Sequence, residues 1–323
     1  MAKTARPGSD PLEQRATNGG RGFRPRATSH RDEVEGGTVW RTVGVTSDWA
    51  PLRAVMLAWP GAELEFREDP DAWLMLARPR LDAMRRECEG IARFYEDQGV
   101  AVHLARPGAL PPPNFIFQRD LYQATADGMI LARTGAEQRA GEERFAAQAL
   151  AGIGAPILAT MTGTAIFEGA DLVTVDRHTA LLGLGRRTNA EAALRLTRIL
   201  GRQGRRVRRV RLPAGVQHLL GIVNLVDRDL AAVHVAKAPP ALRRLLAELG
   251  VRTVDLAPTE ELTVRRGMNF VTLAPRVVVM PAGCPGIRAQ LERARVTVFE
   301  LAVDEYLKAA GGLGCLTGIL HRA

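Results

Sequence analysis

Short apolar runs alternate with segments of helical periodicity from about residue 39 onward. The first of them predict a strand over residues 54–58, a helix over 79–98 and a strand over 100–104. Three later segments repeat a fuller pattern of strand, polar turn, strand, helix and strand. The predicted strands and helices are 173–175, 179–184, 189–200 and 206–212; 222–226, 230–235, 240–249 and 252–256; and 269–273, 277–280, 286–295 and 297–301.

This pattern recurs roughly every fifty residues, with similar periodicity but different letters. Such recurrence is typical of repeat architectures whose units are arranged around a centre. Residues far apart in the sequence can meet where the strand ends converge on that centre. We therefore expect the functional residues there.

Residues 1–37 differ from the rest, because they mix Gly, Pro, Ser, Thr and Arg with almost no apolar periodicity. Such a segment buries too little apolar surface to offset the entropy of ordering, so we expect a disordered basic tail. Residues 38–323 then form one catalytic domain. A hydrophobic content of 46% is sufficient for a substantial core.

The chain has three cysteines, Cys88, Cys284 and Cys315, an odd number without a short metal-ligand spacing. This argues against a disulfide framework and against structural zinc, so we expect no metal and no cofactor. No apolar run approaches the roughly 20 residues that span a bilayer. We expect a cytoplasmic protein without a membrane partner.

Charge changes the picture little. The net charge is +9, and basic residues concentrate in residues 201–211. No aromatic residue is interleaved there to stack on bases, so a solvated surface is favoured over a nucleic-acid groove. We expect no nucleic-acid partner, and the sequence leaves a homo-oligomer open.

Four short segments contain residues able to carry chemistry. Cys315 follows glycines that let the backbone approach a substrate, His218 precedes a predicted strand, Glu168 and Asp171 are separated by small residues, and Asp120 ends an apolar stretch. Each has a structural alternative: a packing cysteine, a core histidine, a tight turn and a surface ion pair. Together they are the groups that thiol-based covalent catalysis requires.

The motifs that contain these residues resemble a known superfamily. Pro-Asn-Phe-Ile-Phe-Gln-Arg-Asp, Glu-Gly-Ala-Asp, Arg-Arg-Thr-Asn, His-Leu and Gly-Gly-Leu-Gly-Cys-Leu-Thr occur in the order of the guanidino-group-modifying enzymes. These include arginine deiminases, dimethylarginine dimethylaminohydrolases and amidinotransferases. The resemblance covers nearly all of residues 49–322 and implies a five-fold pseudosymmetric α/β propeller of ββαβ-type units, the pentein fold.

The resemblance also implies a role for each residue. Cys315 would attack the guanidino carbon, His218 would act as acid and base, Glu168 would orient His218, and Asp120 would hold the guanidinium. Contacts to the rest of a small guanidino substrate would come from Asn114, Phe117, Arg139, Asp171 and Arg187, with the two arginines clamping a carboxylate.

One position departs from the arginine deiminase pattern. Leu220 stands where those enzymes have a second aspartate, which weakens the expected attraction for a guanidinium. Two interpretations stay open: Leu220 faces the substrate, or it packs away while Asp171 takes over. The chemistry also stays open between C–N hydrolysis through an amidino-thioether, amidino transfer to an amine, and non-catalytic binding of a guanidino compound.

Overall fold

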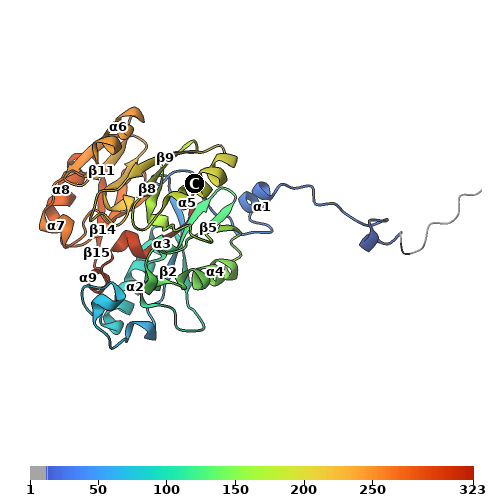
Figure 1. Ribbon diagram of the computed structural model, residues 1–323, viewed down its shortest axis with the longest axis horizontal. Coiled ribbons are helices and arrows are strands. Elements are labelled where there is room, and N and C mark those ends of the chain that lie inside the picture. Colours follow the sequence, from blue (N-terminus) through green and yellow to red (C-terminus); the bar gives the residue numbers. More distant parts are fainter. Residues whose placement is uncertain (1–11, 13) are drawn as a thin grey trace, which may run out of the picture.

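Five small sheets form the body of the protein in the computed structural model, which describes Leu12 and residues 14–323 (Figure 1). The strands, sheet by sheet, are β1 (Gly44–Val45), β16 (Gly318–Arg322), β2 (Leu52–Ala58) and β3 (Ala101–Ala105); β4 (Tyr122–Thr125), β5 (Gly128–Leu131) and β6 (Ile157–Thr160); β7 (Leu172–Thr174), β8 (Thr179–Leu184) and β9 (Arg206–Arg211); β10 (Val223–Asp227), β11 (Leu230–His234) and β12 (Arg252–Leu256); and β13 (Val271–Ala274), β14 (Val277–Pro281) and β15 (Thr297–Leu301).

The four three-stranded sheets share one topology. An antiparallel hairpin is followed by a helix, and the next strand pairs in parallel with the middle strand, as β8 does with β9 over residues Thr179 to Leu184. The connecting helices are α2 (Leu81–Asp97), α4 (Glu142–Gly152), α5 (Ala190–Arg202), α6 (Pro240–Glu248) and α8 (Pro285–Arg293). This arrangement is the pentein-type α/β fold that the sequence predicts.

The C-terminal strand closes the ring of units. β16 pairs antiparallel with β2, with Gly318 opposite Met56, and in parallel with β1. The last strand of the chain therefore supplies the missing hairpin partner of the first unit.

Short helical turns precede the first strand of four units. They are α3 (Gln118–Leu121), η6 (Gly169–Asp171), η7 (Leu219–Gly221) and α10 (Leu313–Leu316). In the remaining unit, Asn269 and Phe270 lie directly before β13. These equivalent positions are the elements that position the site. The other short helices are η1 (Ala16–Asn18), α1 (His30–Gly36), η2 (Ala62–Leu64), η3 (Pro70–Trp73), η4 (Pro113–Ile116), η5 (Glu137–Arg139), α7 (Glu260–Thr263) and α9 (Asp304–Lys308).

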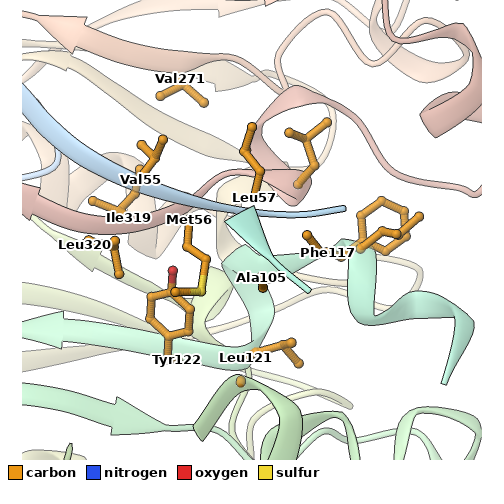
Figure 2. Close-up of a cluster of buried hydrophobic side chains, with 14 of the residues drawn as sticks. Val55, Met56, Leu57, Ala105, Phe117, Leu121, Tyr122, Val271, Ile319 and Leu320 are labelled. Atoms are coloured by element: carbon orange, nitrogen blue, oxygen red, sulfur yellow. The ribbon is translucent and has the colours of Figure 1, made fainter. Parts of the chain in front are cut away.

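An apolar core underlies these turns. Figure 2 shows Met56 and Leu57 of β2 close to Tyr122 of β4 and Ile319 of β16, all of them buried. Burial of each such side chain contributes about 1.5–3 kcal/mol. The core therefore joins the first unit to the C-terminal strand and holds the turns that carry the site.

The predicted strands and helices agree with the structure to within about two residues at each end. The sequence pattern did not predict β4, β5, α4 and β6, nor the closing strand β16. The surface of β6 is mostly exposed and gives little apolar signal, and β16 is recognisable only by its distant partners.

Part of the expected disordered tail is ordered. Helix α1 lies beside β5 in Figure 1, with Val34 fully buried and Arg31 paired to Asp127 at 2.7 Å. Disorder of residues 30–37 is therefore a wrong prediction, because a helix with one buried anchor leaves no periodic pattern. Residues 1–11 and 13 lie outside the described residues, and disorder before residue 30 stays a prediction. Within the described part of the chain, no helix is long and apolar enough to cross a membrane.

Candidate active site

A cavity of about 410 Å³ lies where the short turns of the units meet. Asp120 of α3, His218 at the N-terminus of η7 and Cys315 of α10 line it. Glu168, at the N-terminus of η6, is fully buried behind His218. The four residues predicted to be catalytic are thus brought together, each by the turn that starts its unit.

The glycines around Cys315 permit close packing. A Cβ at Gly311 would overlap the Phe117 ring, and one at Gly312 would lie 2.7 Å from Oδ1 of Asn269. Asn269 accepts a hydrogen bond from the Cys315 backbone N–H and donates one to its Sγ, each at 3.1 Å. The sulfur is therefore held in place by a side chain from the neighbouring unit.

The Cys315 thiol is the half-exposed one, whereas Cys88 and Cys284 are buried. Burial and the nearby Asp120 carboxylate raise the pKa of Cys315, while Arg266 and Asn269 act to lower it. Burial raises the pKa of Cys88 and of Cys284 to about 11. Cys315 alone of the three combines access to the cavity with groups that favour its thiolate.

His218 and Glu168 form a tightly bonded pair. Nε2 of His218 lies 2.6 Å from Oε2 of Glu168 and 3.9 Å from Oδ1 of Asp120. Burial opposes the charged imidazole, but the carboxylates of Asp120, Glu168 and Asp171 outweigh it and raise the pKa of His218 to about 9. Burial likewise opposes ionisation of Glu168, yet His218, Arg139 and Arg187 lower its pKa. At neutral pH the pair is an imidazolium and a carboxylate.

Arg139 connects the buried acids behind the cavity. Its guanidinium donates to Asp120 at 2.6 Å and to Glu142 at 2.8 Å, and it lies 3.6 Å from Glu168. Burial raises the pKa of Glu142 to about 7 in spite of this pairing. Arg187 donates to Glu168 at 3.0 Å. We call the six residues Asp120, Arg139, Glu142, Glu168, Arg187 and His218 the charge network.

Three acids and three cations balance within the charge network when all are ionised. One acceptor remains: Oδ1 of Asp120 is buried and has no hydrogen-bond partner in the described part of the structure. A buried acceptor without a partner is costly, so this oxygen is suited to receive a donor from a ligand.

The same place contains the donor atoms of a possible cation site. Asp120, Glu168 and His218 offer ligand atoms within 4.8 Å of one another. Their carboxylates are already compensated by Arg139 and Arg187 at close range. This donor set therefore attracts a metal ion poorly, and the absence of a metal cofactor stays a prediction.

Two residues expected to contact substrate have other partners. Asp171 does not line the cavity; its carboxylate accepts from the Thr188 hydroxyl at 2.6 Å and from the Leu219 N–H at 2.9 Å. Arg139 reaches the cavity wall but is 2% exposed, and its N–H groups serve the protein's own acids. Asp171 therefore fixes the turn after His218, and Arg139 is not available to clamp a carboxylate.

The remaining expected contacts do line the cavity. Asn114, Phe117 and Arg187 are part of its wall, and Nδ2 of Asn114 donates to the Trp73 carbonyl at 2.6 Å. Leu220 also lines it, half-buried. Leu220 therefore lies at the cavity and Asp171 does not, and a contact between Leu220 and substrate stays a prediction.

Sequence reasoning missed Asn269 and Glu142. Asn269 occupies the position before the first strand of its unit, as the other site residues do, so an alignment of the repeats would have singled it out. Glu142 gives no comparable signal, because an acid in the first turn of a helix is usually a solvated dipole partner.

Comparisons with known proteins give two sequence matches. Residues 105–235 match the arginine deiminase family model. The N(G),N(G)-dimethylarginine dimethylaminohydrolase of Pseudomonas aeruginosa is 27% identical over 212 residues, which are 64% of this chain and 79% of that protein.

Solved structures share the fold. The dimethylarginine dimethylaminohydrolase of Pseudomonas aeruginosa in complex with citrulline matches with a TM-score of 0.68 and 22% identity, over 84% of this chain and all of that one. SxtG, an amidinotransferase from Microseira wollei, matches with a TM-score of 0.68 and 14% identity, over 87% and 97% of the two chains. Taken together, the sequence matches and the shared fold support the resemblance to the guanidino-group-modifying superfamily.

Proposed function

We propose that this protein is a cysteine-dependent hydrolase that cleaves a C–N bond at the guanidino carbon of an arginine-like compound. The observation that carries the proposal is one cavity holding a half-exposed thiol, an imidazolium paired to a buried carboxylate, and an unpartnered Asp120 oxygen. These are a nucleophile, an acid with its orienting group, and an acceptor for a guanidinium N–H.

The first half-reaction forms a covalent intermediate. A guanidinium bound at Oδ1 of Asp120 adds positive charge beside Cys315, which favours release of the thiol proton to solvent. The thiolate electron pair then forms a C–S bond at the guanidino carbon. The tetrahedral adduct collapses as one C–N bond breaks, and the leaving amine takes its proton from His218. An amidino-thioether and a neutral imidazole remain.

The second half-reaction returns the enzyme. Neutral His218 removes a proton from water, and the resulting hydroxide adds to the amidino carbon. The C–S bond breaks with its electron pair on sulfur and the added hydroxyl group loses its proton to solvent, which gives back the thiolate and a ureido product. Glu168, at 2.6 Å, keeps the imidazole oriented through both halves.

Leu220 bears on the choice of substrate. The cavity presents one free carboxylate oxygen to a guanidinium, and the apolar side chain of Leu220 also lines it. A guanidinium N–H group that loses its water against leucine finds no hydrogen-bond partner there, which is unfavourable. An apolar substituent in place of the N–H hydrogen avoids this penalty. We therefore expect N-substituted guanidino compounds to be preferred over free arginine.

Product analysis tests the proposal. Wild type and Cys315→Ser are incubated with arginine, N-methylated arginines and agmatine, with and without glycine as an amine acceptor, and products are identified by mass spectrometry. We expect a ureido product from the wild type and none above background from Cys315→Ser. A product in which the acceptor carries the amidino group would establish transfer instead. Binding without any product would indicate a non-catalytic protein, and serine-variant turnover within about tenfold of wild type would exclude the thiol mechanism.

A further inference from the structure

A second, much smaller cavity adjoins the candidate active site. Its volume is about 30 Å³, and Asp48, Arg119 of α3 and Arg322 of β16 lie in its wall. The residues that line both cavities are Arg119, Leu220, Asn224, Phe270 and Gly314. The small cavity has room for a water molecule or a monatomic ion. We call it the inner cavity.

Three buried arginines gather around one buried acid beside the inner cavity. Arg119, Arg205 and Arg322 are 5%, 6% and 4% exposed. Nη2 of Arg119 lies 3.7 Å from Oδ1 of Asp48, whose carboxylate also acts electrostatically on Arg205 and Arg322. Nη2 of Arg205 donates at 3.1 Å to the carbonyl of Val45, which stands opposite Arg322 in the pairing of β1 with β16. Three cations therefore share one buried carboxylate, whereas the charge network balances three cations with three acids.

Arg322 and Arg205 have donors without partners. Nη1 of Arg322 donates to the carbonyls of Ala50 and Thr272 at 2.8 and 2.7 Å, but its Nε has no hydrogen-bond partner in the described part of the structure. The same holds for Nε and Nη1 of Arg205, which is the buried arginine of the basic run over residues 201–211. Buried donors of this kind cost free energy until an acceptor reaches them.

The guanidinium of Arg119 makes only long contacts with neutral acceptors. Its Nη1 and Nη2 lie 3.4 Å from Oε1 of Gln123 and from the carbonyl oxygen of Leu172, beyond the usual range of a hydrogen bond. The neighbouring carboxylate of Asp120 is already bound by Arg139 at 2.6 Å. Arg119 therefore retains capacity for an acceptor in the inner cavity.

Much of the remaining wall is apolar and screens these charges poorly. The apolar side chains of the lining are Leu220, Phe270, Val271 and Ile319. Burial lowers the pKa of Arg322 to about 10, an effect that Asp48 opposes and Arg119 strengthens. The guanidinium is still charged at pH 7, so the inner cavity keeps an excess of positive charge. A buried charge without a partner is costly, and a counter-ion placed there is held strongly.

We propose that the inner cavity binds a halide ion, chloride or bromide, between the guanidinium groups of Arg119 and Arg322. A halide accepts N–H donors from several directions, supplies the missing negative charge and has no hydrogen that needs an acceptor of its own. A water molecule would satisfy the donors and leave the excess charge in place. This site goes beyond the proposed function and does not depend on it.

Crystals of the wild-type protein grown with sodium bromide test the site directly, because bromide gives an anomalous signal at its absorption edge and water does not. We expect an anomalous peak in the inner cavity, in contact with the guanidinium groups of Arg119 and Arg322. Density without an anomalous signal at this place would identify water and overturn the proposal. Bromide peaks confined to exposed arginines would overturn it as well.

Thermal unfolding measures the same binding in solution. Tm is recorded in sodium chloride and in sodium gluconate, whose anion is too large for the inner cavity, at equal ionic strength. The Tm in chloride minus the Tm in gluconate is then compared between variants, because general effects of the two salts act on every variant alike. We expect this difference to be about 2–4 °C larger in the wild type than in Arg322→Gln, the shift produced by a ligand at about ten times its dissociation constant.

A second variant predicts the opposite sign. Asp48→Asn keeps an oxygen that accepts from the Thr174 N–H, a bond of 2.9 Å in the wild type, and removes the negative charge that competes with a halide. Its Tm difference between chloride and gluconate should exceed that of the wild type. The control is Arg295→Gln, which changes an exposed arginine outside the lining of both cavities and should keep the wild-type difference.

A purely structural role of these residues gives a different result. It would lower Tm equally in both salts, and an unchanged difference in Arg322→Gln overturns the proposal. A smaller difference in Asp48→Asn than in the wild type also overturns it. If Arg322→Gln does not fold, the bromide crystals and Asp48→Asn decide the question.

Discussion

Two groups of basic and acidic side chains at the cavity differ in whether their charges are paired within the protein. The charge network around Asp120, Glu168 and His218 is buried and neutralises itself, with Arg139 joined to three acids. His234, Lys237 and Arg266 also line the cavity and have no ion pair to a described acid. The charge network is preorganised for chemistry and leaves one acceptor free, whereas these three side chains keep their hydrogen-bonding capacity. The difference teaches that paired charges fix the positions of catalytic groups, and that unpaired ones are available to a ligand.

The largest expected effect is the difference in kcat and KM between a catalytic residue and a residue of the unpaired group. His218→Ala removes the acid and base, so we expect kcat to fall by about 10²–10⁴-fold with a smaller change in KM. Lys237→Ala removes a cation from the cavity lining and should raise KM with kcat nearly preserved. Steady-state kinetics on the best substrate of the wild type measures both. A preserved kcat in His218→Ala would show that this histidine only binds or packs.

Stability gives the second contrast. Arg139→Met leaves Asp120 and Glu142 buried without their cation, so we expect the free energy of unfolding to fall by about 3–5 kcal/mol. Arg187→Met should cost much less, because Arg187 is partly exposed and Glu168 keeps His218 and the Gly135 N–H as partners. Urea denaturation monitored by circular dichroism measures the difference. Similar losses in the two variants would contradict the description of Arg139 as the centre of the network.

A third comparison concerns Leu220, an apolar residue of the cavity lining. Leu220→Asp should shift the ratio of kcat/KM values toward unsubstituted arginine by about ten- to a hundredfold, since a carboxylate can pair with the guanidinium N–H groups. Leu220→Asn, which has the shape of aspartate without the charge, is the matched control. Efficient turnover of plain arginine by the wild type, or an unaltered ratio in Leu220→Asp, would mean that Leu220 does not contact the guanidinium.

The smallest expected effect concerns the pKa of the Cys315 thiol. Burial and then Asp120 raise the pKa of Cys315, whereas Arg266 lowers it. Reaction with iodoacetamide should therefore still accelerate above pH 9 in the wild type. Asp120→Asn should move the midpoint of this rise to lower pH and Arg266→Gln to higher pH. Shifts in the same direction would contradict opposite effects of Asp120 and Arg266 on the pKa of Cys315.

The sequence predicted the repeat because its signal is local. β8, β12 and β15 coincide with the predicted strands, since apolar alternation bounded by turn residues is encoded within a few residues. The resemblance, read from short motifs, also singled out Cys315, His218, Glu168 and Asp120. These four lie at the starts of units, where the structure brings Asp120, His218 and Cys315 to one cavity and buries Glu168 against His218.

Other features depend on partners far along the chain. The ion pairs of Arg139, the retreat of Asp171 from the cavity and the sulfur contact of Asn269 each join residues from different turns or units. The closing strand β16 is defined by its pairing with β2. No local pattern contains this information, because a side chain's partners are set by how the units pack.

The sequence by itself thus determined the order of most strands and helices, the motifs and the set of reactive groups. The tertiary structure alone decided which of those groups have free hydrogen-bonding capacity. That capacity depends on distance and burial: Arg139 and Arg266 are the same residue type, yet Arg139 is enclosed by three carboxylates, whereas Arg266 lines the cavity without an ion pair to a described acid. A charge buried with its partners serves the fold and the catalyst, and a charge left unpaired is available to a ligand.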